Sequence, residues 1–387
     1  MNRLYRAIMI ILACAVAGLL QDFQGVSSAA VAKESQNQKY IVNLTVRSSH
    51  NAELISRLDI DSPAISQALL AAKQETVTDV LSLTDVYVTL LQGGHNIQAR
   101  LEKSGNVVDE AAWKRLVLPK KAADSLLHAA EALRKQHYGK LVSWEVAERM
   151  LPRKSKFSIT DLETGLTFKV QRRAGEDHAD VQPLTKKDSK IMKQIYDGNW
   201  SWKRRAILVQ SGNEWLAASM NGMPHGGDGI PDNDFSGHFC VHYAGSSTHR
   251  SDQPDLAHQL MVYKAAGSLR SFLDAASPLA LAKSVVEAMD HQDSEILRQA
   301  SEGIAKEKFE GLVQEMKSMS YIRFLEQKKA EKNKLDDSGS NEKLTDEVKL
   351  PLEFQKHGGS KRSKAYTFIF KRDSVQSPWR MEDIVTK

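Results

Sequence analysis

Cys240 is the residue around which the chain concentrates its potential for chemistry. It is one of two cysteines, and segment 221–258 around it holds five of the twelve histidines. His238 precedes Cys240 by two residues, His242 follows it by two, and His225 lies upstream in a loop rich in Gly and Asp. A thiol reacts as its thiolate, and an imidazole can take the thiol proton and later return it. The pattern predicts a nucleophilic cysteine with a histidine base.

The expected strand geometry brings these side chains together. Residues two apart on an extended segment face the same side, so His238, Cys240 and His242 should project together. His225 would approach from the preceding loop. The loop glycines would let the backbone come close to a substrate and turn N–H groups toward an oxyanion: Gly226, Gly227, Gly229 and Gly237. Candidates to line the same cleft are Asn221, Met223, Trp200, Trp202 and Trp215, although we expect at least two of the tryptophans to be core or cross-strand hairpin residues instead.

The first residues have the pattern of a secretory signal. Arg3 and Arg6 precede an apolar run over 7–20, and Ala30-Val31-Ala32 suits a signal peptidase. The run is shorter than the ~20 residues that span a bilayer, so cleavage is preferred to a retained anchor. We expect an exported protein of the cell envelope or extracellular space, which contacts a membrane only through 1–32 if that segment is retained.

Removal of this segment would also remove Cys14. Cys240 would then be the only thiol in a compartment where paired cysteines oxidise, which excludes a disulfide within the chain. A lone cysteine can also be a small buried apolar residue. The flanking histidines favour the catalytic interpretation.

Length and composition favour several globular domains. A chain of 387 residues with 41% apolar content is too long for one domain and can bury a core in each of several. The net charge of +5 comes from 53 basic residues dispersed among 48 acidic ones. Because they form no basic stripe, we expect no nucleic-acid partner.

The order of expected elements indicates an α+β protein. It divides into a signal over 1–32, an α/β accessory domain over 40–150, a β-rich catalytic domain over 155–273 and a cone-like α+β domain over 277–387. We can assign the accessory domain no chemistry.

Turn and cap residues locate several elements. Hairpins are expected over 85–102, over 157–173 around Glu163-Thr164-Gly165, and over 205–220, which leads directly to His225. Segment 141–151 alternates, and the Pro and basic turn after it predict a boundary. Helices should begin after Ser62, Thr185, Asp252 or Asp255, and Ser277. Later helices are expected to reach about residue 328, followed by a charged loop over 328–343 and strands over 347–356, 364–373 and 379–385.

The order His225-Gly226, Ser236, His238, Cys240 resembles the active-site signature of L,D-transpeptidase (YkuD-like) catalytic domains. There a His-Gly pair precedes a Ser-His-Gly-Cys run. The resemblance implies Cys240 as the nucleophile and His225 as the base, with His238 as the second histidine.

The chain departs from this signature near the cysteine. Phe239 replaces the glycine before it, His242 replaces an Arg or Asn after it, and Gly237 is an extra residue. The resemblance implies acyl transfer on peptidoglycan stem peptides, through a thioester that an amine or water resolves, without a cofactor. We assign substrate binding to His242, Ser236, Gly226, Gly237 and Asn221.

Two other functions compete with this one. A zinc-dependent peptidoglycan peptidase needs three N or O ligands and an open position, although no H-E-x-x-H motif is present. Its candidate ligands are His178, Asp180, His238, His242 and His249. A non-catalytic wall-binding or assembly protein would simply pack its histidines, as we expect for His249 and His258.

The last part of the chain resembles the nuclear-transport-factor-two-like (SnoaL-like) cone. Helices ending in Ala-Met-Asp-His-Gln-Asp are followed by long antiparallel strands and a closing Trp-Arg-Met-Glu-Asp-Ile strand. The resemblance implies a curved sheet packed on helices.

Overall fold

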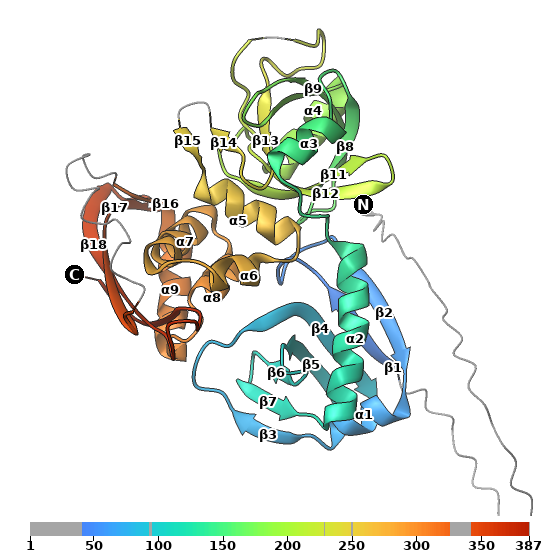
Figure 1. Cartoon of the computed structure of the whole chain (residues 1–387), viewed down its shortest axis with the longest axis vertical. Coiled ribbons are helices and arrows are strands. Elements are labelled where there is room, and N and C mark those ends of the chain that lie inside the picture. The colour runs from blue at the N-terminus through green and yellow to red at the C-terminus, as the bar shows by residue number, and fades with distance from the viewer. Residues whose placement is uncertain (1–40, 93–94, 228, 249–250, 326–341, 387) are drawn as a thin grey trace, which may run out of the picture.

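The computed structural model describes residues 41–92, 95–227, 229–248, 251–325 and 342–386. The expected signal over 1–32, His249 and most of the charged segment 328–343 lie outside these residues. The described chain has an α+β fold with an N-terminal sheet, a central barrel, and C-terminal helices with their own sheet (Figure 1). None of the described helices combines the length and apolar composition that a membrane crossing requires.

The N-terminal region is a seven-stranded sheet in the order β2-β1-β4-β5-β6-β7-β3. Its elements are β1 Ile41–Val46, β2 Ser56–Asp61, α1 Pro63–Leu70, β3 Lys73–Thr76, β4 Leu83–Gln92, β5 His95–Glu102, β6 Val107–Asp109, β7 Lys114–Val117 and α2 Lys120–His137. The hairpin expected over 85–102 is confirmed as β4 and β5. Ser62 caps α1 as expected, by accepting a hydrogen bond from the Ile65 N–H at 3.4 Å.

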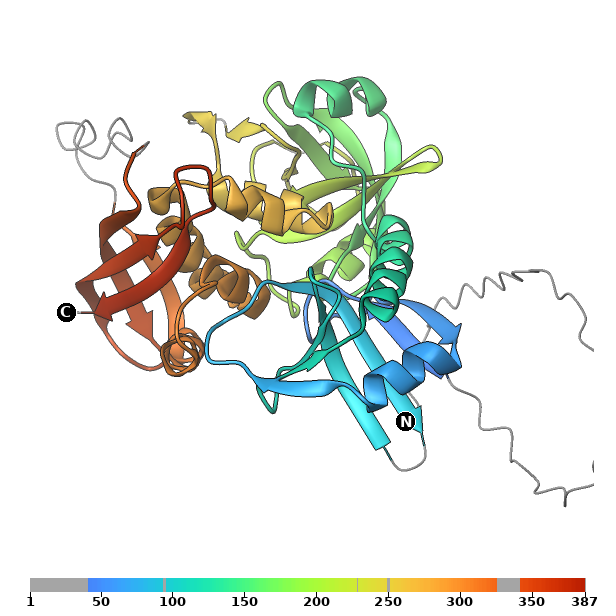
Figure 2. The same cartoon turned by 60° about the horizontal axis from the view of Figure 1, so that its bottom comes forward.

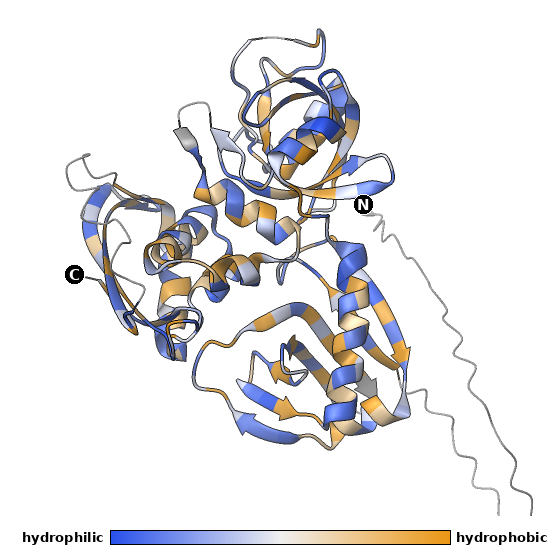
Figure 3. Ribbon diagram, in the orientation of Figure 1, coloured by the Kyte–Doolittle hydropathy of each residue, from blue (hydrophilic) through white to orange (hydrophobic). Residues whose placement is uncertain are grey.

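Alternation of apolar and polar residues gives this sheet one buried face. Val42, Leu44 and Val46 of β1 are fully buried, and the polar residues Asn43 and Thr45 alternate with them. Hydrophobic and hydrophilic colours alternate along the strands of the sheet (Figure 3). Helix α2 packs on β1 and β2 and contributes Leu126 and Leu133 to the same core. The region therefore has a hydrophobic core of its own.

The central region is a closed barrel of six strands in the order β10-β13-β12-β11-β8-β9. Its elements are α3 Trp144–Met150, β8 Lys156–Asp161, β9 Thr167–Ala174, β10 Ala179–Pro183, α4 Lys186–Ile195, β11 Arg205–Ser211, β12 Glu214–Met220, β13 Phe239–His242, and the separate pair β14 Ser247–Thr248 and β15 Ser251–Pro254. The expected hairpins are confirmed as β8–β9 and β11–β12. Thr185 caps α4 as expected, by accepting from the Asp188 N–H at 3.3 Å.

Segment 141–151 differs from the alternating segment expected there. It forms α3, whose Trp144 and Ala147 are buried with Leu151 in the barrel core. Spacings of three and four residues between these positions are those of a helix. The barrel region therefore begins before residue 150.

The C-terminal region combines helices with a four-stranded antiparallel sheet in the order β16-β17-β18-β19, along one side of α7 and α9 (Figures 1 and 2). Its elements are α5 Leu256–Ala265, α6 Leu269–Asp274, α7 Pro278–His291, α8 Ser294–Ala300, α9 Lys306–Ser318, β16 Met319–Phe324, β17 Thr345–Lys356, β18 Lys361–Lys371 and β19 Arg380–Thr386. Asp255 and Ser277 cap α5 and α7 as expected. Strand β16 lies where helices were expected to continue.

Helix α5 connects the barrel to the C-terminal helices. It packs on β11 and β12, and Leu260 of α5 shares a core with Ala206 and Leu208 of β11. The alternate residues Ile207 and Val209 face the barrel interior. Because β11 is buried on both faces, the hairpin that leads to the His225 loop has little freedom to move.

Candidate active site

Strand β13 places Cys240 between two neighbouring strands. Cys240 lies opposite Asp180 of β10, and His242 lies opposite Ser219 of β12. Phe239 is fully buried and joins the barrel core, so Cys240 and His242 project from the other face of the strand. The expected period of two is confirmed. The Phe239 side chain therefore points away from the thiol.

His225 reaches Cys240 from the loop after β12. Its backbone pairs with that of His238, through N–H to carbonyl bonds of 3.0 and 2.7 Å. Nε2 of His225 lies 3.3 Å from Sγ of Cys240, and Nδ1 lies 2.9 Å from the carbonyl oxygen of Met223. Because a carbonyl can only accept, Nδ1 carries a proton, and Nε2 can accept one from the thiol. This is the tautomer that a base for Cys240 requires.

Two glycines allow this close approach. Gly226 has φ +72°, and a Cβ there would lie 2.3 Å from Cε1 of His238. Gly237 has φ +101°, and a Cβ there would lie 2.3 Å from the carbonyl oxygen of His225. The carbonyl of Gly237 also accepts a hydrogen bond from the Gln182 side chain. Side chains at either glycine would separate the two histidines.

His178 lies next to Cys240 on the inner side of the site. It directly precedes β10, so Asp180 faces the same side two residues later. Nε2 of His178 lies 3.3 Å from Oδ1 of Asp180, and Nδ1 lies 2.9 Å from the carbonyl oxygen of Ser247. Nε2 of His238 lies 3.5 Å from the same Oδ1. Asp180 thus connects the histidines on both sides of the thiol, a role that the sequence did not indicate.

Behind the thiol, three imidazole rings form a buried stack. The ring centroids of His178 and His242 are 4.4 Å apart, and those of His242 and His258 are 3.7 Å apart. Burial, then the neighbouring His258 and His178, lower the pKa of His242 well below its ordinary value. Nδ1 of His258 contacts Oγ of Ser219 at 2.9 Å. His258 is therefore a packed helix-face residue, as expected.

The position of His242 corrects its assignment to substrate binding. Only 1% of its surface is exposed, because it is enclosed between two rings on the inner side of Cys240. We now place it behind the thiol as a supporting residue. The sequence pattern predicts the face of β13 on which His242 lies. It does not predict that helix α5 covers this face.

The other assigned residues differ in access to solvent. Ser236 is exposed, and Gly226 is exposed beside His225. Gly237 is buried, and Asn221 is 4% exposed, with its N–H 3.4 Å from the carbonyl oxygen of Cys240. Ser236 and Gly226 remain suited to direct substrate contact, whereas Gly237 and Asn221 shape the backbone around Cys240.

Trp202 forms an exposed wall beside the base. Its ring centroid lies 5.0 Å from that of His225, and half of its surface is exposed. Trp200, two residues earlier, instead packs edge-on against Phe235. Solvent therefore reaches the site on the side of Trp202 and His225.

These contacts determine the charges of the site. Burial raises the pKa of the Cys240 thiol, but contacts with His178 and His225 outweigh it, so that the pKa lies below the ordinary thiol value. The hydrogen bond with Cys240 raises the pKa of His225. Burial lowers the pKa of His178, yet Asp180 and Cys240 raise it to about 10. The arrangement favours a thiolate paired with imidazolium.

Two overlapping donor sets in the described chain have the composition of a metal site. They are His178, Cys240 and His242, and His225, His238 and Cys240, with donor atoms within 4.8 Å of one another in each. Thiolate and imidazole are ligands that Zn²⁺ prefers. A metal would have to replace contacts of His178 with Asp180 and of His225 with Cys240. Both sets include the Cys240 thiol, which was not among the zinc ligands expected from the sequence.

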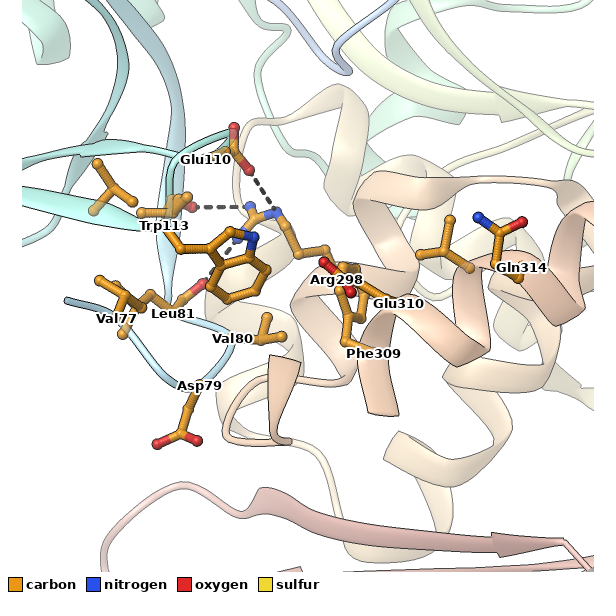
Figure 4. Close-up of a pocket in the computed structure, with 13 residues that line it drawn as sticks. Val77, Asp79, Val80, Leu81, Glu110, Trp113, Arg298, Phe309, Glu310 and Gln314 are labelled. Atoms are coloured by element: carbon orange, nitrogen blue, oxygen red, sulfur yellow. Dashed lines mark hydrogen bonds and ion pairs between the residues drawn. The ribbon is translucent and has the colours of Figure 1, made fainter. Parts of the chain in front are cut away.

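An apolar cavity of about 270 Å³ lies elsewhere, between the N-terminal sheet and helices α8 and α9 (Figure 4). Trp113 and Phe309 line it. Arg298 at its wall already donates to the carbonyl oxygen of Leu81 at 2.8 Å and to Glu295 at 2.7 Å. None of the lining residues belongs to the Cys240 cluster, so the two features are separate.

Comparison of the chain with protein-family models, with curated proteins and with solved structures finds no match in any of the three.

Proposed function

We propose that the chain is an exported cysteine acyltransferase that acts on peptidoglycan stem peptides, by transpeptidation or hydrolysis. The observation that carries the proposal is the 3.3 Å contact between Sγ of Cys240 and Nε2 of His225, with the tautomer of His225 set by the carbonyl of Met223. A positioned thiol and base are the parts that covalent acyl transfer requires.

The proposed reaction passes through a thioester. The Cys240 thiolate attacks the carbonyl carbon of a peptide bond and forms a C–S bond. When the C–N bond breaks, the leaving amine takes the proton held on Nε2 of His225. An incoming amine or water then attacks the thioester and gives its proton to His225, and Sγ leaves with the electron pair of the C–S bond. The thiolate and imidazolium are thereby restored.

The substrate class rests on the family resemblance together with the site. The order His225-Gly226, Ser236, His238, Cys240 supports an L,D-transpeptidase-like domain within the barrel region. The exposed ring of Trp202 offers an apolar surface beside the base for the body of a peptide. The net charge of +5 suits an anionic wall polymer.

The proposal extends to the rest of the chain. The signal pattern over 1–32 supports export to the cell envelope. The C-terminal helices and antiparallel sheet support a nuclear-transport-factor-two-like domain over 277–387, and the N-terminal sheet with α1 and α2 is an accessory region. Neither flanking region contributes a residue to the described contacts of Cys240.

Product analysis tests the proposed reaction. The full chain is incubated with purified stem peptides, and products are identified by mass spectrometry. The wild-type protein should release a terminal amino acid or form cross-linked dimers, and Cys240→Ser should do neither while retaining its thermal unfolding profile. Activity in Cys240→Ser would disprove the thiol mechanism.

A chelator separates this mechanism from a zinc peptidase. Activity should persist after dialysis against a chelator and be lost after treatment with iodoacetamide. Loss with the chelator alone, restored by Zn²⁺, would instead assign the cluster to a metal centre.

A further inference from the structure

The imidazoles beside Cys240 differ in their access to solvent. His225 is half-buried and lies against the exposed Trp202, and 19% of the His238 side chain is exposed. His178 is 1% exposed and lies on the inner side. A residue that exchanges protons with substrate needs access, which His225 has and His178 lacks.

The contacts of His178 indicate a cation. Its Nδ1 faces the carbonyl oxygen of Ser247, which can only accept a hydrogen bond. Its Nε2 lies 3.3 Å from Oδ1 of Asp180, within ion-pair distance of the carboxylate. A protonated ring donates to the Ser247 carbonyl through Nδ1 and holds its positive charge beside the Asp180 carboxylate. Burial then protects this charge from screening.

We infer that His178, held by Asp180, is a positioning residue that keeps Cys240 ionised before substrate arrives, while His225 carries the proton. The division of roles rests on the proposed function, but the ionisation of Cys240 does not. Cys240 lies directly opposite Asp180 across β10 and β13, and its Sγ is within 4.8 Å of a ring nitrogen of His178. The thiolate thus has one partner that moves a proton and one that does not.

The charged and titratable groups around Cys240 come from three elements. His178 and Asp180 belong to β10 and the residues before it, and His225 belongs to the loop after β12. His238 and His242 flank Cys240 along its own chain. His242 is held neutral by burial, so His178 and His225 supply the positive charge.

Alkylation of Cys240 measures its ionisation directly. The full chain, first dialysed against a chelator, is treated with iodoacetamide across a pH series, and the Cys240 peptide is quantified by mass spectrometry, which separates it from Cys14. His178→Gln should raise the pH of half-maximal reaction by about one to three units, because it removes a nearby cation. An unchanged midpoint would overturn the inference.

Asp180→Asn tests the inference through the direction in which it shifts the pH midpoint of alkylation. If Asp180 acts only through its own negative charge, its removal should stabilise the thiolate and lower the midpoint. If it holds His178 in the charged form, its removal should raise the midpoint, as His178→Gln does. A lowered midpoint would therefore contradict the inference.

His242→Gln is the matched control. His242 is as buried as His178 and belongs to the same stack of rings. Its replacement removes no positive charge, so the alkylation midpoint of this variant should stay near the wild-type value. An equal rise in this variant would assign the effect to packing and reject the inference. The midpoints do not depend on stem-peptide turnover, so failure of the proposed function and failure of this inference give different results.

Discussion

At the scale of residues, Cys240 and His225 form the pair whose protonation should control the reaction. The pKa of the thiol is lowered by contacts with His178 and His225, which outweigh burial, and the pKa of His225 is raised by its hydrogen bond with Cys240. Attack requires the thiolate, and departure of the amine requires the imidazolium. The two shifts widen the pH range in which both forms coexist.

This pair predicts a bell-shaped dependence of kcat/KM on pH. The rate should fall on the acid side as the thiolate is protonated, with the midpoint below the ordinary thiol value of ~8.5. It should fall on the alkaline side as His225 loses its proton, with the midpoint above the ordinary imidazole value of ~6.5. Initial rates on stem peptides measure the profile. A rate that continued to rise through the ordinary thiol pKa would be at odds with an ion pair.

Part of this residue-scale site could be predicted from the sequence. The shared face of Cys240 and His242 follows from the period of a strand, and the loop position of His225 follows from the glycines around it. His178 and Asp180 appeared only as candidate metal ligands, because their approach to Cys240 depends on the pairing of β10 with β13. That pairing joins segments distant in the chain, and no local pattern reports it.

At the scale of elements, the loop between β12 and β13 positions the base. Its backbone pairing between His225 and His238 depends on positive φ angles at Gly226 and Gly237. The rigid β11–β12 hairpin holds one end of the loop and β13 holds the other. The position of the His225 ring therefore depends on the backbone conformation of Gly226 and Gly237 as much as on the histidine itself.

Gly226→Ala should reduce turnover without unfolding the barrel. Its Cβ would meet the ring of His238, which must then shift with His225, and a displacement of about 1 Å costs on the order of a hundredfold in rate. Gly227→Ala is the matched control, because a Cβ at Gly227 has no atom within 4 Å. Stem-peptide kinetics compare the two variants. Equal activity would show that the loop does not set the position of His225.

Sequence patterns located hairpins and caps better than they located short elements. Gly, Ser and Thr at turns and helix starts act locally, so the β8–β9 and β11–β12 hairpins and the cap at Thr185 were predictable. The sequence of α3, which begins at Trp144, fits a helix but also alternates like a strand. Burial against the barrel core selects the helix. The strand β16 follows α9 without a turn, and its pairing with β17 across segment 326–341 is again a long-range contact.

At the scale of the whole molecule, a buried charge cluster joins the N-terminal sheet to the C-terminal helices. Glu295 of α8 contacts Arg100 of β5 at 3.0 Å and Arg298 at 2.7 Å. All three side chains are almost fully buried. Burial raises the pKa of Glu295, but Arg100 and Arg298 outweigh it and hold the pKa well below the ordinary value. The carboxylate balances two buried cations at the junction.

Glu295→Gln should destabilise the protein by about 3 kcal/mol or more, because it leaves buried arginines without their counter-charge. Chemical denaturation at neutral pH measures the loss. Since the folded pKa of Glu295 is depressed, its stabilisation is present above the unfolded value of ~4.3 and is lost as pH falls through the folded value. Glu110→Gln is the control, since Glu110 contacts Arg100 at 3.4 Å but is 38% exposed. Its effect should stay below about 1 kcal/mol, and equal losses would refute the junction role.

The central claim is that Cys240 forms a covalent acyl intermediate, and intact-protein mass spectrometry tests it most directly. The chain is mixed with stem peptides, quenched in acid at short times and digested to locate the added mass. An acyl group on Cys240 that appears and decays with turnover, and that is absent from Cys240→Ser, is the predicted result. Turnover of the peptides with no acyl group on Cys240 at any time would contradict the account.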